Sequence, residues 1–192
     1  MSEPISFFAK IHISQKNYDA FLKAKPVSPI LNDNWISWWT AKEMHSKKQL
    51  TQEDLMSLEN HYTNNQEVIE RWIGDSEAYG DNFAFSNYDA TNETWHFGII
   101  FYSANYFDML LCMAFVKNIE TYKLVKDNDF AILYDYYWSG NEISALLTFN
   151  NNECIIDNAI QSKMDIKFEL FEVAENYLNM LWNDNELEEK LI

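Results

Sequence analysis

The chain has 192 residues, a formal net charge of −16 and an apolar content of 47%. This length and composition predict a single domain over 1–192 with a packed core, and they exclude an intrinsically disordered chain. The acidic balance argues against binding to nucleic acid or to an anionic membrane surface, since both repel negative charge. A role of the charge in solubility alone is the competing interpretation.

We expect no targeting signal at the N-terminus. The N-terminal residues 1–8 contain no basic leader, and their apolar stretch is too short for a signal peptide. No window approaches the roughly 18 unbroken apolar residues of a membrane-spanning helix. We therefore expect a cytoplasmic protein, with an acidic tail over 183–192 that frays.

The first elements are a strand and a short helix. A partly alternating apolar pattern predicts a strand over 5–13, and Ser14 is placed to cap a helix over 15–24. The run Trp35–Trp39 is short and favours β structure, although a helical turn remains open.

A longer helix is expected next. Apolar residues recur at helical spacing over 51–73, and Thr51 with Asp54 forms a variant of the capping box at its start. The sequence at 63–65 is expected to break this helix in two, and Gly74 to end it.

The middle of the chain is less regular. Residues 74–93 are rich in Asp, Asn and Ser and predict a loop, with one short strand at 83–85. A strand follows over 94–102. The run 106–116 is ambiguous: its composition favours a helix capped by Ser103, but the second strand of a hairpin is nearly as well supported.

The last third of the chain predicts a sheet and a closing helix. Turn-forming residues separate four β-rich runs, at 121–125, 130–138, 143–149 and 153–156. The order of all elements predicts an α+β fold. In this fold an antiparallel meander over about 120–157, with N-terminal strands, packs against several helices, including about 51–73 and 166–182. We expect the helices on one face of the sheet.

Signals for catalysis are missing. The chain has four histidines, at His12, His45, His61 and His96. Their spacing suits no metal-binding motif, and His96 is expected to lie in a strand with a satisfied ring. Four glycines form no phosphate-binding loop, and no serine lies in a nucleophile turn. Cys112 and Cys154 match no zinc or redox motif, and Cys112 is expected to be buried. We predict no catalytic residue, metal or cofactor.

One segment stands out by charge and ring content. Between Arg71 and Lys117 the chain has no lysine or arginine but six carboxylates and twelve aromatic residues. Negative charge steers a cationic partner, and aromatic rings supply contact area at low entropic cost. We predict that this partner-binding surface is centred on the loop from 75 to 93. Its candidate residues are Trp72, Asp75, Glu77, Tyr79, Asp81, Tyr88, Asp89 and Glu93.

Two other interpretations of these residues are open. Carboxylates among aromatic rings also describe clefts that hydrolyse sugars, in which Asp75 with Glu77, or Asp89 with Glu93, would be acid and base. A small carbohydrate-acting enzyme or sugar-binding domain is therefore an alternative, and an adaptor or chaperone for a secreted protein is a third. The single arginine, Arg71, is expected to pair with the residue four positions earlier, a glutamate.

In size, charge and aromatic content the chain resembles the immunity proteins that protect bacteria from their own or a neighbour's polymorphic or secreted toxins. The resemblance includes no motif, so it carries over no functional residue. It implies a cytoplasmic inhibitor in bacterial competition that blocks the active site of a cognate, cationic effector. It also implies binding to protein rather than to nucleic acid or membrane, and it leaves the oligomeric state open.

Overall fold

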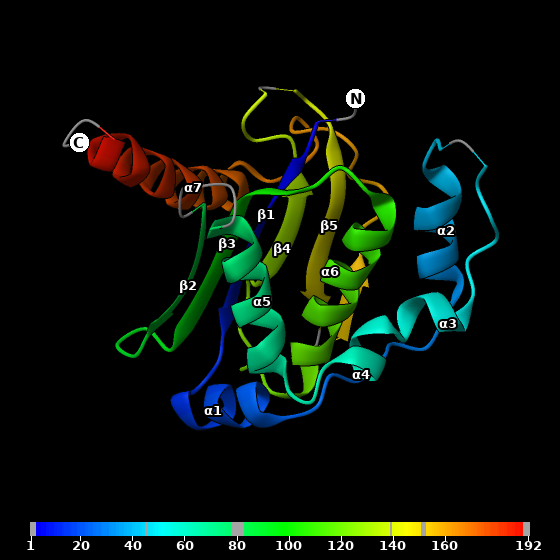
Figure 1. Ribbon diagram of the computed structural model, residues 1–192, viewed down its shortest axis with the longest axis horizontal. Coiled ribbons are helices and arrows are strands. Elements are labelled where there is room, and N and C mark those ends of the chain that lie inside the picture. Colours follow the sequence, from blue (N-terminus) through cyan, green and yellow to red (C-terminus); the bar gives the residue numbers. More distant parts are fainter. Residues whose placement is uncertain (1–2, 45, 78–82, 139, 151–152, 190–192) are drawn as a thin grey trace.

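A six-stranded antiparallel sheet runs through the described part of the computed structural model, in the order β2-β3-β1-β4-β5-β6 (Figure 1). Described residues are 3–44, 46–77, 83–138, 140–150 and 153–189, with backbone alone at 76–77 and 184–189. The strands are β1 (Ile5–His12), β2 (Ala84–Asp89), β3 (Thr94–Ser103), β4 (Phe130–Tyr134), β5 (Ile143–Asn150) and β6 (Glu153–Ile156). The N-terminal strand is thus central, and the meander β4–β5–β6 forms one half of the sheet.

Helices cover both faces of this sheet. The helical elements are α1 (Gln15–Lys23), α2 (Asp33–Ala41), α3 (Gln52–Leu55), α4 (Ser57–His61), α5 (Asn65–Glu77), α6 (Tyr106–Asn118), the 3-10 turn η1 (Ile119–Thr121) and α7 (Phe168–Glu189). Side chains of α1–α6 join the core on one face, and α7 packs on the other (Figure 1). The α+β class is confirmed. The expectation that all helices lie on one face of the sheet was wrong.

The central strand shows why both faces need cover. Phe7, Ala9 and Ile11 point into the core under α1–α6, whereas Phe8 points into the core under α7. A strand buried on both sides lacks the apolar–polar alternation of a half-exposed one. The pattern of β1 could therefore predict the strand but not the second layer.

Two tyrosines of the meander attach α7. Tyr134 and Tyr136 lie on the same face, as strand alternation predicts, and both pack in the core under α7. The Tyr134 hydroxyl donates to Glu175 at 3.0 Å, and the Tyr136 hydroxyl donates to Asn179 at 2.7 Å. These bonds fix the helix at two successive turns.

The tryptophan run is a helix rather than a strand. The side chain of Asn32 accepts hydrogen bonds from the backbone N–H groups of Asn34 and Trp35, which caps α2. Trp38 and Trp39 are buried, so tertiary packing and the cap outweigh the β propensity of the run.

The long helix predicted over 51–73 is divided into α3, α4 and α5. The break at 63–65 is confirmed, and so is the start, where the Asp54 carboxylate accepts from the Thr51 N–H at 2.9 Å. The end at Gly74 was wrong, because α5 continues to Glu77. An exposed glycine costs a helix only about 1 kcal/mol, so a single one need not end it.

Three further boundaries differ from expectation. The run 106–116 is helical, but Asn105 rather than Ser103 caps it, by accepting from the Phe107 N–H. The run 121–125 is not a strand: Thr121 ends η1, and residues 122–125 form a loop. Strand β4 ends at Tyr134, because the Asp135 carboxylate accepts from the backbone N–H groups of Trp138 and Gly140 and forms a turn.

A buried carboxylate organises the loop before β4. The side chain of Asp129 is 0% exposed, and its Oδ2 lies 2.9 Å from Nζ of Lys123, which is 1% exposed. Its Oδ1 accepts from the backbone N–H of His12 at 2.9 Å and lies 2.5 Å from the His12 ring. The carboxylate therefore joins this loop to the end of the central strand.

His96 lies in a strand as predicted, but its ring is not fully satisfied. Its Nδ1 is buried and has no hydrogen-bond partner among the described residues. The ring stacks on Tyr177 at 4.2 Å. Burial, aided by the charge of Lys10, lowers the pKa of His96 to about 4. The folded protein thus holds a neutral imidazole.

This neutral imidazole makes stability depend on pH. The unfolded chain takes up a proton near pH 6.5, whereas folded His96 stays neutral down to about pH 4. The unfolded state binds more protons between these values, so the contribution of His96 to stability is full above pH 6.5 and falls as the pH drops towards 4. Since each pH unit between the two pKa values is worth about 1.4 kcal/mol, we expect a loss approaching about 3 kcal/mol.

Urea unfolding at pH 7 and pH 4.5 checks this expectation. His96→Phe should flatten the decline, whereas His61→Gln, at an exposed position of α4, should leave it unchanged. Equal declines in the wild type and His96→Phe would contradict the assignment.

Candidate partner-binding site

An open hollow of about 880 Å³ lies where α5, β3 and the start of α6 meet. Carboxylates and aromatic rings both line it. We call it the acidic hollow, and its main residues are Trp72, Asp75, Phe83, Phe101, Tyr102 and Asp108. They come from segments up to 36 positions apart in the chain (108 − 72 = 36), brought together by packing α5 and α6 beside β3.

Trp72 forms the inner wall of the hollow. Its ring stacks on Phe97 at 6.1 Å and meets Phe115 and Tyr102 edge-on at 5.1 and 5.5 Å. Because three rings fix its orientation, it loses little further freedom when a partner contacts it. Its half-buried surface suits an anchor.

The two carboxylates of the hollow are held differently. Asp75 pairs with Arg71 at 2.9 Å, and both side chains are more than half exposed (53% and 65%). Such a surface pair contributes only about 0–1 kcal/mol, so a partner's cation can replace the arginine. Asp108 is half-buried in the first turn of α6 and accepts from the Ser103 hydroxyl at 2.6 Å. It is therefore the more firmly placed charge.

This ion pair corrects the expectation for Arg71. The predicted partner, Glu67, instead accepts from the N–H and hydroxyl of Thr63 before α5. Arg71 pairs in the opposite direction along the helix, which brings it to the mouth of the acidic hollow.

Half-exposed rings extend the acidic hollow from the end of β3 towards the segment after β4 and α7. Phe83 and Phe101 meet at 4.9 Å, and Phe101 meets Tyr137 at 5.0 Å. Tyr137 and Trp138 are 39% and 45% exposed. Trp182 of α7 lies 4.9 Å from Tyr137. We call this group the aromatic rim; its residues are Phe83, Phe101, Tyr137, Trp138 and Trp182.

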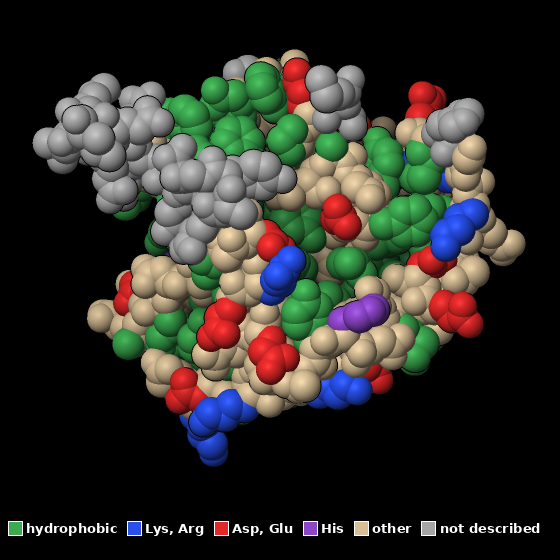
Figure 2. Space-filling model, viewed as in Figure 1, with side chains coloured by type: hydrophobic (Ala, Val, Ile, Leu, Met, Phe, Trp, Pro, Cys, Tyr) green, Lys and Arg blue, Asp and Glu red, His purple; other side chains and the backbone are tan. Residues whose placement is uncertain are grey.

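The charge of the molecule is less concentrated than its sequence suggests. Figure 2 shows acidic side chains spread over the face that carries α5 and α6, with hydrophobic side chains surfacing between them. The surface is thus acidic overall, and the hollow differs from its surroundings by combining carboxylates with rings.

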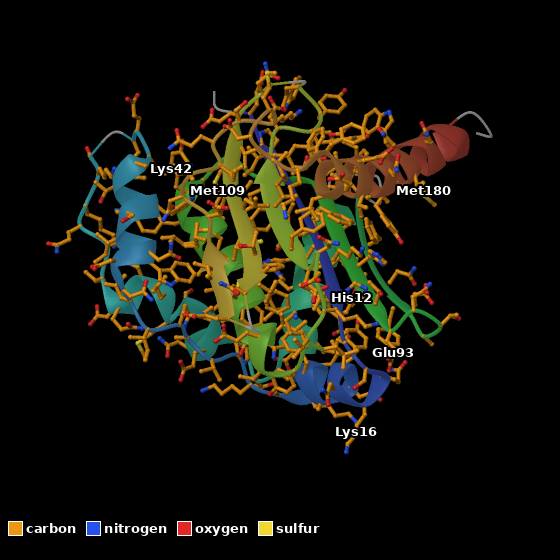
Figure 3. All side chains as sticks on the ribbon, turned by 180° about the vertical axis from the view of Figure 1, so that it is seen from behind. His12, Lys16, Lys42, Glu93, Met109 and Met180 are labelled. Atoms are coloured by element: carbon orange, nitrogen blue, oxygen red, sulfur yellow. The ribbon has the colours of Figure 1, made fainter. Side chains whose placement is uncertain are left out.

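The predicted site residues divide into two groups. Trp72 and Asp75 line the acidic hollow, whereas Tyr88, Asp89 and Glu93 lie at the β2–β3 hairpin. Five residues of β3 separate the two places, which is roughly 17 Å. Figure 3 shows Glu93 beside His12, at the end of the sheet away from α7. The loop predicted over 74–93 was wrong, because α5 and β2 occupy much of it.

Three predicted residues have no described side chain. Tyr79 and Asp81 lie outside the described residues, and Glu77 is described only as the last residue of α5.

The hairpin residues have structural roles. The Tyr88 ring stacks on Tyr18 at 4.8 Å, and its hydroxyl donates to the carbonyl of Ile13. Asp89 accepts from the N–H groups of the turn that follows it. Glu93 adopts a left-handed conformation with φ of 49°, which closes the turn.

The pKa of Asp89 bears on the sugar-hydrolysis alternative. Hydrogen bonds from the side chain and backbone of Asn92 lower it below the usual value. A general acid in such a cleft needs a raised pKa. Asp89 therefore does not fit the role of the general acid.

Seven residues of the acidic hollow and the aromatic rim were not among the predicted site residues: Phe83, Phe101, Tyr102, Asp108, Tyr137, Trp138 and Trp182. The first four lie in the cation-free segment, so its charge and ring content could have been a signal. The other three depend on long-range packing, since the segment after β4 and α7 approach the end of β3 only in the folded chain.

A second, smaller pocket of about 420 Å³ lies between α2 and β5. Lys42 sits in it over the rings of Trp38 and Tyr106, at 5.2 and 6.0 Å from their centroids. Burial lowers the pKa of Lys42, and the charge of Glu142 opposes this shift. Figure 3 places Lys42 far from His12 and Glu93.

No family model matches the chain, and no curated protein or solved structure matched it. Among the described residues there is no group of three or more metal-ligating side chains that could hold an ion. None of the described helices is long and apolar enough to cross a membrane. Cys112 and Cys154 are buried and unbonded to each other.

Proposed function

We propose that this chain is a cytoplasmic immunity protein that binds a cationic bacterial toxin and blocks its active site. The observation that carries the proposal is the acidic hollow, where Asp75 and Asp108 stand beside rigidly packed rings. A lysine or arginine of the partner fits such a site, because carboxylates neutralise its charge and ring faces contact its stem and head.

Binding is expected to proceed in two steps. The net charge of −16 raises the rate of encounter with a basic protein. A basic side chain then displaces Arg71 from Asp75 and approaches Asp108, while the exposed rings of Tyr137 and Trp138 contact apolar surface around it. Residues that bind an anionic substrate in the toxin become unavailable when carboxylates occupy them.

The alternative of a sugar-binding domain draws on the same hollow, since rings and carboxylates also bind sugars. An adaptor for a secreted protein would likewise use it. Both remain distinguishable outcomes: a sugar-binding domain binds oligosaccharide without a protein partner, and an adaptor binds its partner without abolishing activity.

Co-expression tests the proposal. If a neighbouring gene encodes a protein with a basic C-terminal domain, that domain is the toxin to express in bacteria with and without this chain. We expect growth to be restored by the wild type and by Glu169→Gln/Glu172→Gln, which alters exposed positions of α7. The Asp75→Asn/Asp108→Asn variant should fail to restore it. Equal rescue by both variants would exclude the acidic hollow as the inhibitory surface.

A further inference from the structure

The two edges of the sheet are treated differently. Strands β2 and β6 are the edge strands of the described sheet. In an antiparallel strand, every second residue turns its N–H and C=O away from its neighbour, so an edge exposes these groups. The fate of these outward groups decides whether an edge can accept another strand.

At β6 all four outward groups are occupied. The Asp157 N–H donates to the carbonyl of Leu146, so the backbone N–H and C=O groups of Cys154 and Ile156 point away from β5. The Asn34 side chain accepts from the Ile156 N–H at 2.9 Å and donates to its carbonyl at 2.7 Å. Two further side chains bond to the backbone of Cys154: Glu120 accepts from its N–H and Lys117 donates to its carbonyl, both at 2.9 Å. Side chains here replace a seventh strand.

At β2 the corresponding groups of Ser86 and Tyr88 are open among the described residues. The N–H of Ile100 donates to the carbonyl of Phe83, which places Ser86 and Tyr88 in outward positions. Among the described residues, no hydrogen bond engages the backbone N–H or C=O of Ser86 or Tyr88. The Ser86 hydroxyl accepts from Trp95 and the Tyr88 hydroxyl donates to Ile13, so only the side chains are engaged. Figure 1 shows β2 at the outer side of the sheet.

The charge beside this edge selects the occupant. Burial, followed by the charges of Glu93, Asp19 and Asp89, raises the pKa of Tyr88. These three carboxylates therefore act on the end of the edge strand. A second copy of this chain would bring the same carboxylates towards their counterparts, which like-charge repulsion disfavours. An extended segment with lysine or arginine at alternate positions is complementary instead.

We propose that the β2 edge binds an extended basic segment of the protein partner, which adds a seventh strand beside Ser86 and Tyr88. The inference rests on the proposed function, because it names how the same partner is held. Backbone hydrogen bonds supply affinity, and Asp89 and Glu93 supply preference for basic side chains. The predicted hairpin residues thus belong to a second contact, roughly 17 Å from the acidic hollow.

Amide hydrogen exchange of the ¹⁵N-labelled protein provides the test. In the free protein, the amides of Ser86 and Tyr88 are expected to exchange at least about 100-fold faster than that of Ile156. Asn34→Ala should accelerate Ile156 and leave Ser86 unchanged, which serves as the matched control. Slow exchange of Ser86 and Tyr88 in the dilute free protein would overturn the inference. If the exchange of Ser86 and Tyr88 becomes slower as the protein concentration rises, two copies pair at this edge. That result would overturn the inference as well.

The probe is the synthetic peptide acetyl-Lys-Val-Lys-Thr-Lys-Val-amide, in three forms. The unmodified peptide should slow the exchange of Ser86 and Tyr88 by about tenfold or more at saturation. In the second form the amide nitrogens of the odd-numbered residues are methylated, and in the third those of the even-numbered residues. One of these two peptides should lose the effect and the other should keep it, since only one set of N–H groups faces the β2 edge. No slowing at millimolar peptide, or equal behaviour of both methylated peptides, would overturn the proposal.

The outcomes separate this inference from the proposed function. A toxin complex that forms and inhibits but leaves the exchange of Ser86 and Tyr88 unchanged would exclude the edge and retain the function. Slowing by the unmodified peptide without any rescue in the co-expression test would retain the edge and exclude the function.

Discussion

Replacing Asp129 by asparagine is expected to lower the free energy of unfolding by about 3–5 kcal/mol. The change removes the charge that pairs with Lys123, whose side chain is 1% exposed, and so leaves a buried ammonium without its carboxylate. It also weakens the contact with His12 that fixes the loop before β4. For a chain of this size the melting temperature should fall by about 6–20 °C. Thermal and urea unfolding measure both quantities.

A neighbouring residue provides the control. Asp127→Asn removes the same charge from the same loop at an exposed position, and should change stability by no more than about 0.5 kcal/mol. Replacing both partners, as in Lys123→Met/Asp129→Leu, should restore much of the loss, because no buried charge remains. A small effect of Asp129→Asn would show that the ion pair is open to solvent.

The second large effect is expected on binding. Asp75→Asn/Asp108→Asn should weaken the complex with the proposed cationic toxin by about 2–5 kcal/mol, which is at least about 30-fold in Kd. The partner's basic side chain would then be desolvated in the acidic hollow without a compensating charge. Calorimetric titration of the purified proteins measures this difference.

The double variant at Glu169 and Glu172 isolates the local effect. It changes the net charge by the same amount on an exposed part of α7, so it should slow encounter slightly and leave Kd within about threefold. Equal weakening by both variants would assign binding to net charge rather than to the acidic hollow.

Local signals predicted most elements of the fold. The Thr51 capping box, the Ser14 cap and the turn residues of the meander act within a few positions, so the sequence reveals them. Packing decided the remaining elements. Residues Trp35–Trp39 are helical because Asn32 caps the helix and because the tryptophan rings are buried in the core. A propensity scale includes neither contribution.

The site was only half predictable, for a related reason. Trp72 and Asp75 could be selected because charge and rings cluster along the chain there. Asp89 and Glu93 share that local pattern, yet β3 carries them to the other end of the sheet. Trp182 joins the aromatic rim only through the position of α7. The open β2 edge depends on strand order, which composition does not determine.

The most direct test of the central claim is the salt dependence of association between this chain and its protein partner. Because the chain carries a charge of −16 and is proposed to bind a cation, the association rate constant should fall by about tenfold or more between 20 and 200 mM salt, while dissociation changes little. An association rate that stays constant over this range would contradict recognition of a cationic partner.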